Sequence, residues 1–266
     1  MASGTNRNDI YRRDFDPKDY MDTYFNKTSG LFMDDHYLKF ILTHLHNTFS
    51  SGDVKGDTLI DIGSGPTIYQ IMSACEAFKE IIATDFSEKN HQEYKRWLHN
   101  EPGAFDWSHV GEMVCKLEGD RSRWTDKEKK IRAAVKQVLK CDVLESNPLD
   151  PVVLPKVDCL LSLLCLEAAS KDCDTFYCAL QNITTLLKVG GHLVLCGVLG
   201  CKAWMVADKQ FPGLPITEDF LRSSLAKCGY DVKEVQVQPV AGKCNVNLCD
   251  YYGNFYLVAE KKKEVK

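Results

Sequence analysis

The sequence predicts an α/β fold built on a mostly parallel seven-stranded sheet with an antiparallel edge. Apolar runs of strand length alternate with helical patterns along most of the chain, which is typical of a parallel sheet. The last two runs, at 231–237 and 254–258, have no helix between them and therefore indicate an antiparallel edge. A third observation is the stretch Thr58–Thr67, in which an apolar strand runs into a turn with two glycines.

Composition bounds the kind of protein. The chain has 266 residues, of which 44% are hydrophobic and 26% charged, and its net charge is −4. These values indicate a single globular domain over 1–266 and no nucleic-acid partner. Within that domain we expect a helical N-terminal cap or lid over 1–53, a core over 54–260 and a charged tail over 261–266.

Targeting signals and cysteine usage bear on the compartment. No apolar run reaches the ~18 residues of a membrane helix, and the polar start Met1–Arg7 lacks the apolar segment of a secretory signal. The twelve cysteines are scattered without a CxxC pair, which indicates reduced thiols and no metal site. We therefore expect a cytoplasmic monomer with no membrane partner and no metal.

The first fifty residues predict the helical cap. Asp19–Phe25 is dense in aromatic side chains, and Leu38, Ile41, Leu42 and Leu45 recur at helical spacing. A segment of this kind can close a small-molecule site against water.

The core begins with the strand of the glycine turn. That strand, at 59–62, leads into a helix that we expect to start at Pro66, whose missing N–H costs nothing at the first helical position. A second apolar run, at 80–85, ends in an acid. Ser87 then predicts a capped helix that reaches about Leu98.

The second half of the core continues the alternation. A capping box at Thr125–Glu128 predicts a helix that runs through Leu139. Gly229 ends the last helix. The remaining patterns predict strands at 140–143, 157–167 and 192–196, helices at 180–187 and 218–227, and the two closing strands.

The glycine turn favours S-adenosylmethionine over a dinucleotide. Asp61, Gly63 and Gly65 match the start of a dinucleotide fingerprint, but the third glycine position is Ile68. An acid before the first glycine suits a cofactor that has a cationic methionine ammonium and no pyrophosphate.

Acids also follow the next two strands. Asp85 lies 22 residues after Gly63, a position that suits hydrogen bonds to both ribose hydroxyls. Asp142 ends the third strand, where a carboxylate can accept from the adenine amino group. Each acid is also compatible with an ordinary polar strand end, but three in succession favour the cofactor.

Four stretches together resemble the small-molecule N-methyltransferases that act on nicotinamide, phenylethanolamines and indolethylamines. The similarity extends over nearly the whole chain, and its best stretches are Phe15–Tyr20, Leu59–Gln70, Ala104–Ser108 and Ala134–Val143. The resemblance implies a Rossmann-like class I S-adenosylmethionine-dependent methyltransferase, with S-adenosylmethionine as cofactor and a small amine as substrate.

The resemblance also implies a set of cofactor contacts. Two of the family's cofactor positions differ here, because position 25 is often tyrosine and is Phe25, and position 163 is threonine in the nicotinamide enzymes and is Leu163. The positions that keep the family residue are Tyr20, Gly63, Ser64, Tyr69, Asp85, Asn90, Asp142 and Val143.

Two acids are candidate catalytic residues. Glu167, in Cys165-Leu166-Glu167-Ala168, resembles the glutamate that faces the substrate amine in the phenylethanolamine enzymes, and we expect it at the end of the fourth strand. Asp250 lies one residue from a second amine-binding acid of those enzymes. A carboxylate at either position can orient an amine or accept its proton. Glu167 is also compatible with a solvated strand-end acid.

Four residues are candidate substrate contacts. Trp204 and Tyr20 can form aromatic walls, although Trp204 also suits the core. In the nicotinamide enzymes, an aspartate and a serine hold the carboxamide, and these positions are Gly197 and Gly213 here. Glycine donates nothing from its side chain, so the sequence favours an aromatic or alkyl amine.

Several alternatives stay open from the sequence. The favoured function is methylation of an aromatic alkylamine such as an indolethylamine, and the alternatives are methylation of nicotinamide or of a thioether. A non-catalytic protein that binds S-adenosylmethionine is a remote alternative. Methylation of a protein or nucleic acid is disfavoured by the acidic charge and the lid.

Overall fold

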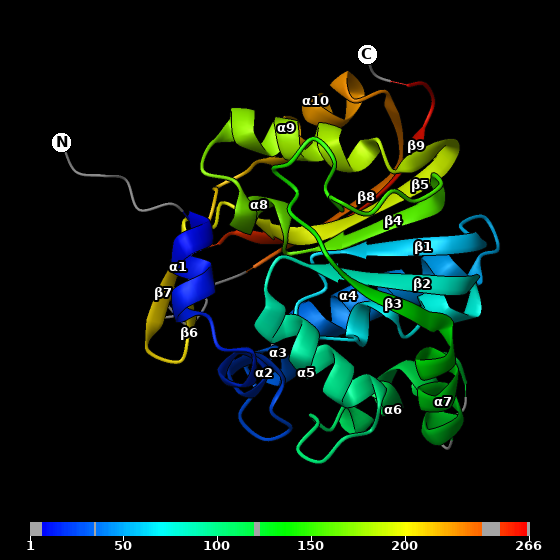
Figure 1. Cartoon of the computed structure of the whole chain (residues 1–266), viewed down its shortest axis with the longest axis vertical. Coiled ribbons are helices and arrows are strands. Elements are labelled where there is room, and N and C mark those ends of the chain that lie inside the picture. Colours follow the sequence, from blue (N-terminus) through cyan, green and yellow to red (C-terminus); the bar gives the residue numbers. More distant parts are fainter. Residues whose placement is uncertain (1–6, 35, 120–122, 241–250, 265–266) are drawn as a thin grey trace.

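A seven-stranded sheet forms the centre of the molecule, which is known from a computed structural model that describes residues 7–34, 36–119, 123–240 and 251–264 (Figure 1). Its strands are β1 (Gly56–Ile62), β2 (Phe78–Asp85), β3 (Val135–Lys140), β4 (Val157–Leu163), β5 (Leu187–Leu199), β8 (Tyr230–Pro239) and β9 (Gly253–Lys261). The strand order is β3-β2-β1-β4-β5-β9-β8. The first five strands in this order pair in parallel, and β9 is antiparallel to both of its neighbours. The predicted parallel sheet with an antiparallel edge is confirmed.

Helices cover both faces of this sheet. Neighbouring residues of β1 point to opposite faces, because side chains alternate along a strand. Leu59 belongs to one buried cluster and Ile60 to the other. The first cluster packs against α4 (His36–Ser50), α5 (Glu88–Leu98), α6 (Ser108–Leu117) and α7 (Trp124–Ala134). The second packs against α9 (Cys173–Thr184) and α10 (Glu218–Lys227).

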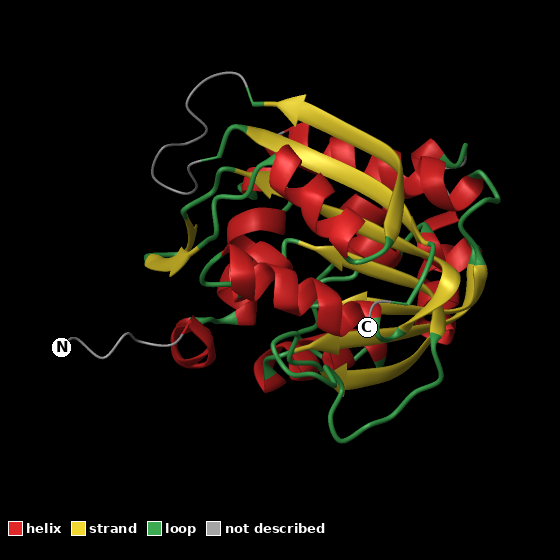
Figure 2. Ribbon diagram, turned by 90° about the horizontal axis from the view of Figure 1, so that it is seen from above, coloured by secondary structure: helices red, strands yellow, loops and turns green. Residues whose placement is uncertain are grey.

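The predicted helical cap is confirmed, and a small β-ribbon lies beside it. The cap begins with α1 (Arg7–Asp14), α2 (Pro17–Phe25) and α3 (Leu31–Asp34), and the ribbon consists of β6 (Ala203–Val206) and β7 (Lys209–Pro212). Helix α1 lies against β7 and α2 against β6, at the same side of the sheet in both views (Figures 1 and 2). This ribbon is not among the elements predicted from the sequence.

The prediction of an α-helix after the glycine turn is wrong. The chain forms only two 3₁₀ segments there, η1 (Tyr69–Ile71) and η2 (Ala74–Glu76). The Thr67 hydroxyl and the Gln70 amide both donate to the Ser64 carbonyl, at 2.9 and 3.1 Å. Side-chain donors of this kind compete with the backbone bonds that an α-helix needs.

The helix predicted to run through Leu139 is too long. Helix α7 ends at Ala134, and the next six residues form β3 at the edge of the sheet. The Val135 and Leu139 spacing fits a helix, but both lie on a strand that pairs with β2. The capping box at Thr125 is also wrong, because α7 begins at Trp124. Ser87 does lie at the N-cap of α5, which ends at Leu98 as predicted, but its side chain makes no capping hydrogen bond.

The predicted charged tail does not begin at Lys261. This residue belongs to β9, and its side chain is fully buried. Its ammonium donates to the carbonyls of Thr184 and Leu187, at 3.0 and 2.8 Å, and pairs with Glu264. A buried ammonium is tolerated when its donors are paired. No helix within the described part of the chain is long and apolar enough to cross a membrane.

Candidate active site

A cavity of about 1050 Å³ opens at the carboxyl ends of β1, β2 and β4. Strand β1 has β2 on one side and β4 on the other, so the chain changes direction across the sheet at this point. Open parallel sheets bind their ligands at such a switch point. Eight of the predicted cofactor residues line the cavity: Tyr20, Gly63, Ser64, Tyr69, Asp85, Asp142, Val143 and Leu163.

The turn after β1 depends on two glycines with left-handed backbone conformations. Gly63 and Gly65 have φ values of 70° and 60°, in the left-handed region that favours glycine. A Cβ atom on Gly63 would also lie 2.3 Å from the Cys165 sulfur. Between the glycines, the Ser64 N–H and hydroxyl both donate to the Thr84 carbonyl, at 2.8 and 3.0 Å, and this fixes the turn against β2.

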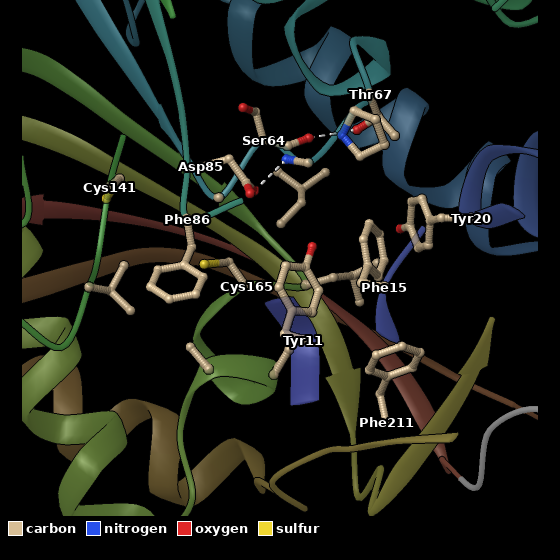
Figure 3. A pocket seen from close by; sticks show the side chains of 18 of the residues that line it. Tyr11, Phe15, Tyr20, Ser64, Thr67, Asp85, Phe86, Cys141, Cys165 and Phe211 are labelled. Atoms are coloured by element: carbon tan, nitrogen blue, oxygen red, sulfur yellow. Dashed lines mark hydrogen bonds between the residues drawn. The ribbon is translucent and has the colours of Figure 1, made fainter. Parts of the chain in front are cut away.

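Asp85 ends β2 and receives three hydrogen bonds. The donors are the Gly65 N–H at 2.9 Å, the Ser87 N–H at 2.7 Å and the Asn90 side-chain amide at 2.9 Å. Burial raises the pKa of Asp85, and these bonds act in the opposite direction. The carboxylate is therefore held in one orientation at the cavity wall, as Figure 3 shows.

Asp61 lines the same cavity, and one of its carboxylate oxygens has no hydrogen-bond partner among the described residues. Its Oδ2 accepts from the Gln70 side chain at 2.8 Å, whereas its Oδ1 is buried and has no hydrogen bond among the described residues. Burial raises the pKa of Asp61 to about 8. A cationic donor bound here would satisfy Oδ1 and favour the charged form.

Asp142 lies in the loop after β3, two residues beyond the strand at which we expected it. Its Oδ1 accepts from the Leu144 N–H at 3.0 Å, and it lines the cavity together with Val143. The acids Asp61, Asp85 and Asp142 thus lie along one cavity. Their arrangement fits a ligand that carries an ammonium, two ribose hydroxyls and an adenine.

Two predicted cofactor residues do not line the cavity. Asn90 is fully buried, and its amide donates to Asp85 and to the Tyr11 hydroxyl, the latter at 3.0 Å. Phe25 is also fully buried, with its ring 5.0 Å from the Tyr69 ring. Both residues therefore support side chains that do line it.

A second cavity of about 620 Å³ adjoins the first. The two cavities share Tyr20, Leu164, Ala168 and Trp204. The remaining lining residues of the second cavity are Tyr24, Phe32, Glu167, Val198, Cys201, Gly213 and Tyr251. Among the described lining residues, Glu167 is the one charged side chain, so a mainly aromatic chamber surrounds a single carboxylate.

Glu167 lies in a short helix and not at the end of the fourth strand. Strand β4 ends at Leu163, Leu164 has a φ of 55°, and α8 (Leu166–Ala169) follows. The Glu167 side chain is buried, and its Oε1 has no hydrogen-bond partner among the described residues. Burial raises the pKa of Glu167 to about 7. Because that value is close to neutral pH, this carboxylate can exchange a proton under ordinary conditions.

The other predicted substrate residues are divided by the structure. Tyr20, Trp204 and Gly213 line the second cavity. Gly197 does not line it, and lies behind the Glu167 carboxylate. Asp250 falls outside the described residues.

The sequence did not assign several aromatic residues that the structure brings to the site. Tyr11 and Phe15, from the segment that leads into α2, stack with ring centroids 4.4 Å apart. The Phe211 ring stacks on Trp204 at 4.7 Å across the β6–β7 ribbon. Figure 3 shows the rings of Tyr11, Phe15, Tyr20 and Phe211 across the cavity from Asp85. No local motif marks these residues, because they meet only in the fold.

Arg7 connects the cap to the second cavity. Its guanidinium donates to the backbone carbonyls of Glu167 and Gly213, at 3.5 and 3.3 Å. The first helix of the chain is therefore attached to two residues that line that cavity.

Comparisons with known proteins show which family the chain resembles. The model of the NNMT/PNMT/TEMT family matches residues 4–262. The chain is 43% identical to an indolethylamine N-methyltransferase from Oryctolagus cuniculus, with 98% of this chain and 99% of that protein covered. It is 46% identical to a nicotinamide N-methyltransferase from Sus scrofa, with 98% of both covered, and 44% identical to a phenylethanolamine N-methyltransferase from Homo sapiens, with 82% and 78% covered.

Solved structures share the fold. A magnesium protoporphyrin IX methyltransferase from Synechocystis, solved with bound SAH, superposes with a TM-score of 0.60 at 11% identity, over 97% of this chain and 100% of that one. An S-adenosylmethionine-dependent methyltransferase from Clostridium acetobutylicum superposes with a TM-score of 0.55 at 12% identity, over 90% and 96%. At these identities, the likeness concerns the fold alone.

Proposed function

Because the chain belongs to the NNMT/PNMT/TEMT family of S-adenosylmethionine-dependent methyltransferases, we propose that its acceptor is an aromatic alkylamine such as an indolethylamine. The observation that carries the proposal is the single buried carboxylate of Glu167 inside an aromatic chamber that adjoins the cofactor cavity. An amine head and an aromatic ring are complementary to these two features.

Different residues around the first cavity are assigned to different parts of the cofactor. We assign Asp85 to the ribose hydroxyls, Asp61 to the methionine ammonium, and Asp142 with Val143 to the adenine. Gly63 and Ser64 provide close backbone approach, and Tyr20, Tyr69 and Leu163 provide packing surface. Phe25 and Asn90 act from behind the cavity wall, through Tyr69 and Asp85. S-adenosylmethionine, when bound, supplies an electrophilic methyl group.

The second cavity must deliver a neutral nitrogen lone pair to that methyl group. Alignment of two reactants can lower a barrier by about 7–11 kcal/mol, so positioning carries much of the rate. The walls formed by Tyr20 and Trp204 stabilise a cationic amine by about 0.5–2 kcal/mol as it enters. The Glu167 carboxylate then takes the proton that the nitrogen must lose, directly or through water. Asp250 is a weaker candidate for a second acid.

Nicotinamide is a less suitable acceptor for this chamber. The carboxamide-binding positions of the nicotinamide enzymes are Gly197 and Gly213 here, and neither glycine has a side chain to offer. A pocket that lacks polar partners for the carboxamide discriminates poorly in favour of an amide substrate. A thioether needs no proton acceptor, so its methylation would not depend on Glu167.

The cellular setting is a further part of the proposal. The ten cysteines in the described ranges form no disulfide, which supports a reducing compartment such as the cytoplasm. The net charge of −4 disfavours a nucleic-acid partner. A monomeric enzyme stays a prediction from the sequence.

A panel of acceptors tests the proposal. Purified protein with methyl-labelled S-adenosylmethionine is incubated with tryptamine, phenylethanolamine, nicotinamide or a thioether, and the transferred label is counted. We expect turnover of the aromatic amines above that of nicotinamide, and its loss in Glu167→Gln. Robust turnover of nicotinamide alone would contradict the proposed acceptor.

A further inference from the structure

Gly197 lies within β5 and has no conformational reason to be glycine. Its backbone is not in the left-handed region, and it pairs in regular register with Phe255 of β9. Glycine inside a strand weakens it and often marks a place where another group approaches the backbone closely. Its surroundings should therefore explain why it is there.

The approaching group is the carboxylate of Glu167. A Cβ atom built on Gly197 would lie 2.3 Å from Glu167 Oε1 and 2.8 Å from Cε1 of the Phe255 ring. Contacts below 3.0 Å do not occur at real Cβ atoms, so any side chain at 197 must move one of these groups. The carboxylate is the end of a flexible side chain, whereas the Phe255 ring is packed in the core.

We propose that Gly197 is a positioning residue for Glu167, because the missing side chain leaves the volume in which the carboxylate lies. The proposal rests on the function proposed above. Backbone hydrogen bonds at Glu167 and Val198 hold the carboxylate on one side, and Gly197 bounds it on the other. Oε1 itself has no hydrogen-bond partner among the described residues, so the space beside Gly197 limits where this oxygen can lie.

Positions 167 and 197 therefore provide room for a single acid. The length of the side chain at 167 and the absence of one at 197 together set how far the acid reaches toward the acceptor nitrogen. A larger residue at 197 is expected to rotate the carboxylate away from its place. This makes position 197 a determinant of acceptor choice even though Gly197 does not line the cavity.

The first test is a mutant cycle between the two positions. Gly197→Ala should lower kcat/KM for tryptamine at least tenfold, mainly through kcat, and leave the Kd for S-adenosylmethionine unchanged. Glu167→Asp shortens the acid by one methylene and vacates the volume that the new methyl group needs. The double variant Glu167→Asp/Gly197→Ala should therefore be more active than Gly197→Ala alone. Additive losses, or wild-type activity in Gly197→Ala, would overturn the proposal.

Two controls separate this role from a general packing defect. Gly253→Ala places a methyl group on the neighbouring strand β9, where the nearest atom is 3.3 Å away, and it should retain activity. Phe255→Leu/Gly197→Ala relieves the ring contact and should not restore activity. If Gly197→Ala is recovered unfolded, the double variant with Glu167→Asp should fold. Rescue by Phe255→Leu instead, or failure of both double variants to fold, would also overturn the proposal.

A direct titration tests the position of Glu167 without any turnover. Carboxyl-labelled glutamate is followed by NMR across pH, and the Glu167 signal is identified by its absence in Glu167→Gln. The midpoint should move from about 7 in the native protein toward the ordinary glutamate value in Gly197→Ala, because the carboxylate leaves its buried place. An unchanged midpoint would contradict the positioning role. Absence of amine turnover in the native protein would instead refute the proposed function alone.

Discussion

The two halves of the active site are built in different ways. The cofactor half combines three acids with a glycine turn, and its central acid, Asp85, is held by three hydrogen bonds. The acceptor half has one carboxylate, Glu167, whose Oε1 has no hydrogen-bond partner among the described residues, surrounded by aromatic rings. The first half fixes a ligand by directed polar contacts, and the second by shape and a single charge. Changes in the first should therefore affect cofactor binding, and changes in the second should affect turnover and acceptor choice.

The largest effect should come from the loss of Glu167. Glu167→Gln keeps the size of the side chain but cannot take a proton, and removal of a general base typically costs about 10²–10⁴-fold in rate. We expect kcat/KM for tryptamine to fall within that range while the cofactor Kd stays unchanged. Steady-state kinetics and calorimetry measure both quantities. Glu218→Gln on α10 is a matched control at an exposed ion pair, and it should behave as wild type. Normal turnover in Glu167→Gln would show that Glu167 is not the proton acceptor.

The next largest effect should be on cofactor binding in Asp85→Ala. Hydrogen bonds to a charged group contribute about 1.5–3 kcal/mol each, so the loss of two ribose bonds predicts roughly a 100-fold or larger rise in Kd. Calorimetric titration with S-adenosylmethionine measures it. Asp57→Ala, near the start of β1, removes only an exposed ion pair with Lys79 and serves as the control. If the two variants bind the cofactor equally well, the ribose assignment is wrong.

The fall of kcat/KM at low pH should follow the protonation of Glu167. Its pKa is raised to about 7 by burial, and only the ionised form can accept a proton. Below pH 7, kcat/KM for an amine should fall by about tenfold per pH unit through this group, on top of the protonation of the amine itself. Thioether methylation in the same buffers needs no proton acceptor and should lack this fall. A thioether profile with the same fall would assign it to another group.

Asp61 should release a proton when the cofactor binds. Its pKa is raised to about 8 in the free protein, and a bound ammonium favours the charged form. At pH 7 we therefore expect binding enthalpies that depend on the ionisation enthalpy of the buffer, and Asp61→Asn should remove most of that dependence. Equal buffer dependence in both proteins would place the titrating group elsewhere.

The last expected effect is on the stability of the free protein. Because the folded-state pKa of Asp61 is raised above its unfolded value, its contribution is complete below the unfolded pKa and is lost as pH rises through 8. Thermal unfolding from pH 5 to pH 9 should show this decline in the native protein and a smaller decline in Asp61→Asn. Parallel curves would indicate that Asp61 does not titrate differently on unfolding.

The same contrast explains what the sequence could predict. The cofactor acids lie at or just beyond the carboxyl ends of successive strands, and parallel strands bring these ends to one edge, so the sequence predicts Asp61, Asp85 and Asp142 together. The acceptor half joins the cap, α8, the β6–β7 ribbon and the segment at Tyr251, which meet only through long-range packing. The ribbon turns at Ala207 and Asp208, so it lacks the Asn-Gly or Asp-Gly pair that marks a two-residue hairpin.

The errors in the fold have local physical causes. Thr67 and Gln70 donate to backbone oxygens after the glycine turn, and the predicted helix became two 3₁₀ segments. Val135 and Leu139 have helical spacing, yet they lie in an edge strand whose pairing with β2 overrides that local pattern. The sequence predicts a solvated charge at Lys261. Its ammonium is instead buried, and this is tolerated because three oxygen atoms accept its hydrogen bonds.

The most direct test of the account is the rate of a single methyl transfer from preloaded enzyme. Protein saturated with labelled S-adenosylmethionine is mixed with tryptamine or with nicotinamide. The reaction is quenched at successive times, and the label transferred to the acceptor is counted. We expect transfer to tryptamine to be at least tenfold faster than transfer to nicotinamide, and we expect Glu167→Gln to remove that advantage. Faster transfer to nicotinamide, unaffected by Glu167→Gln, would contradict the claim that one buried carboxylate in an aromatic chamber selects the acceptor.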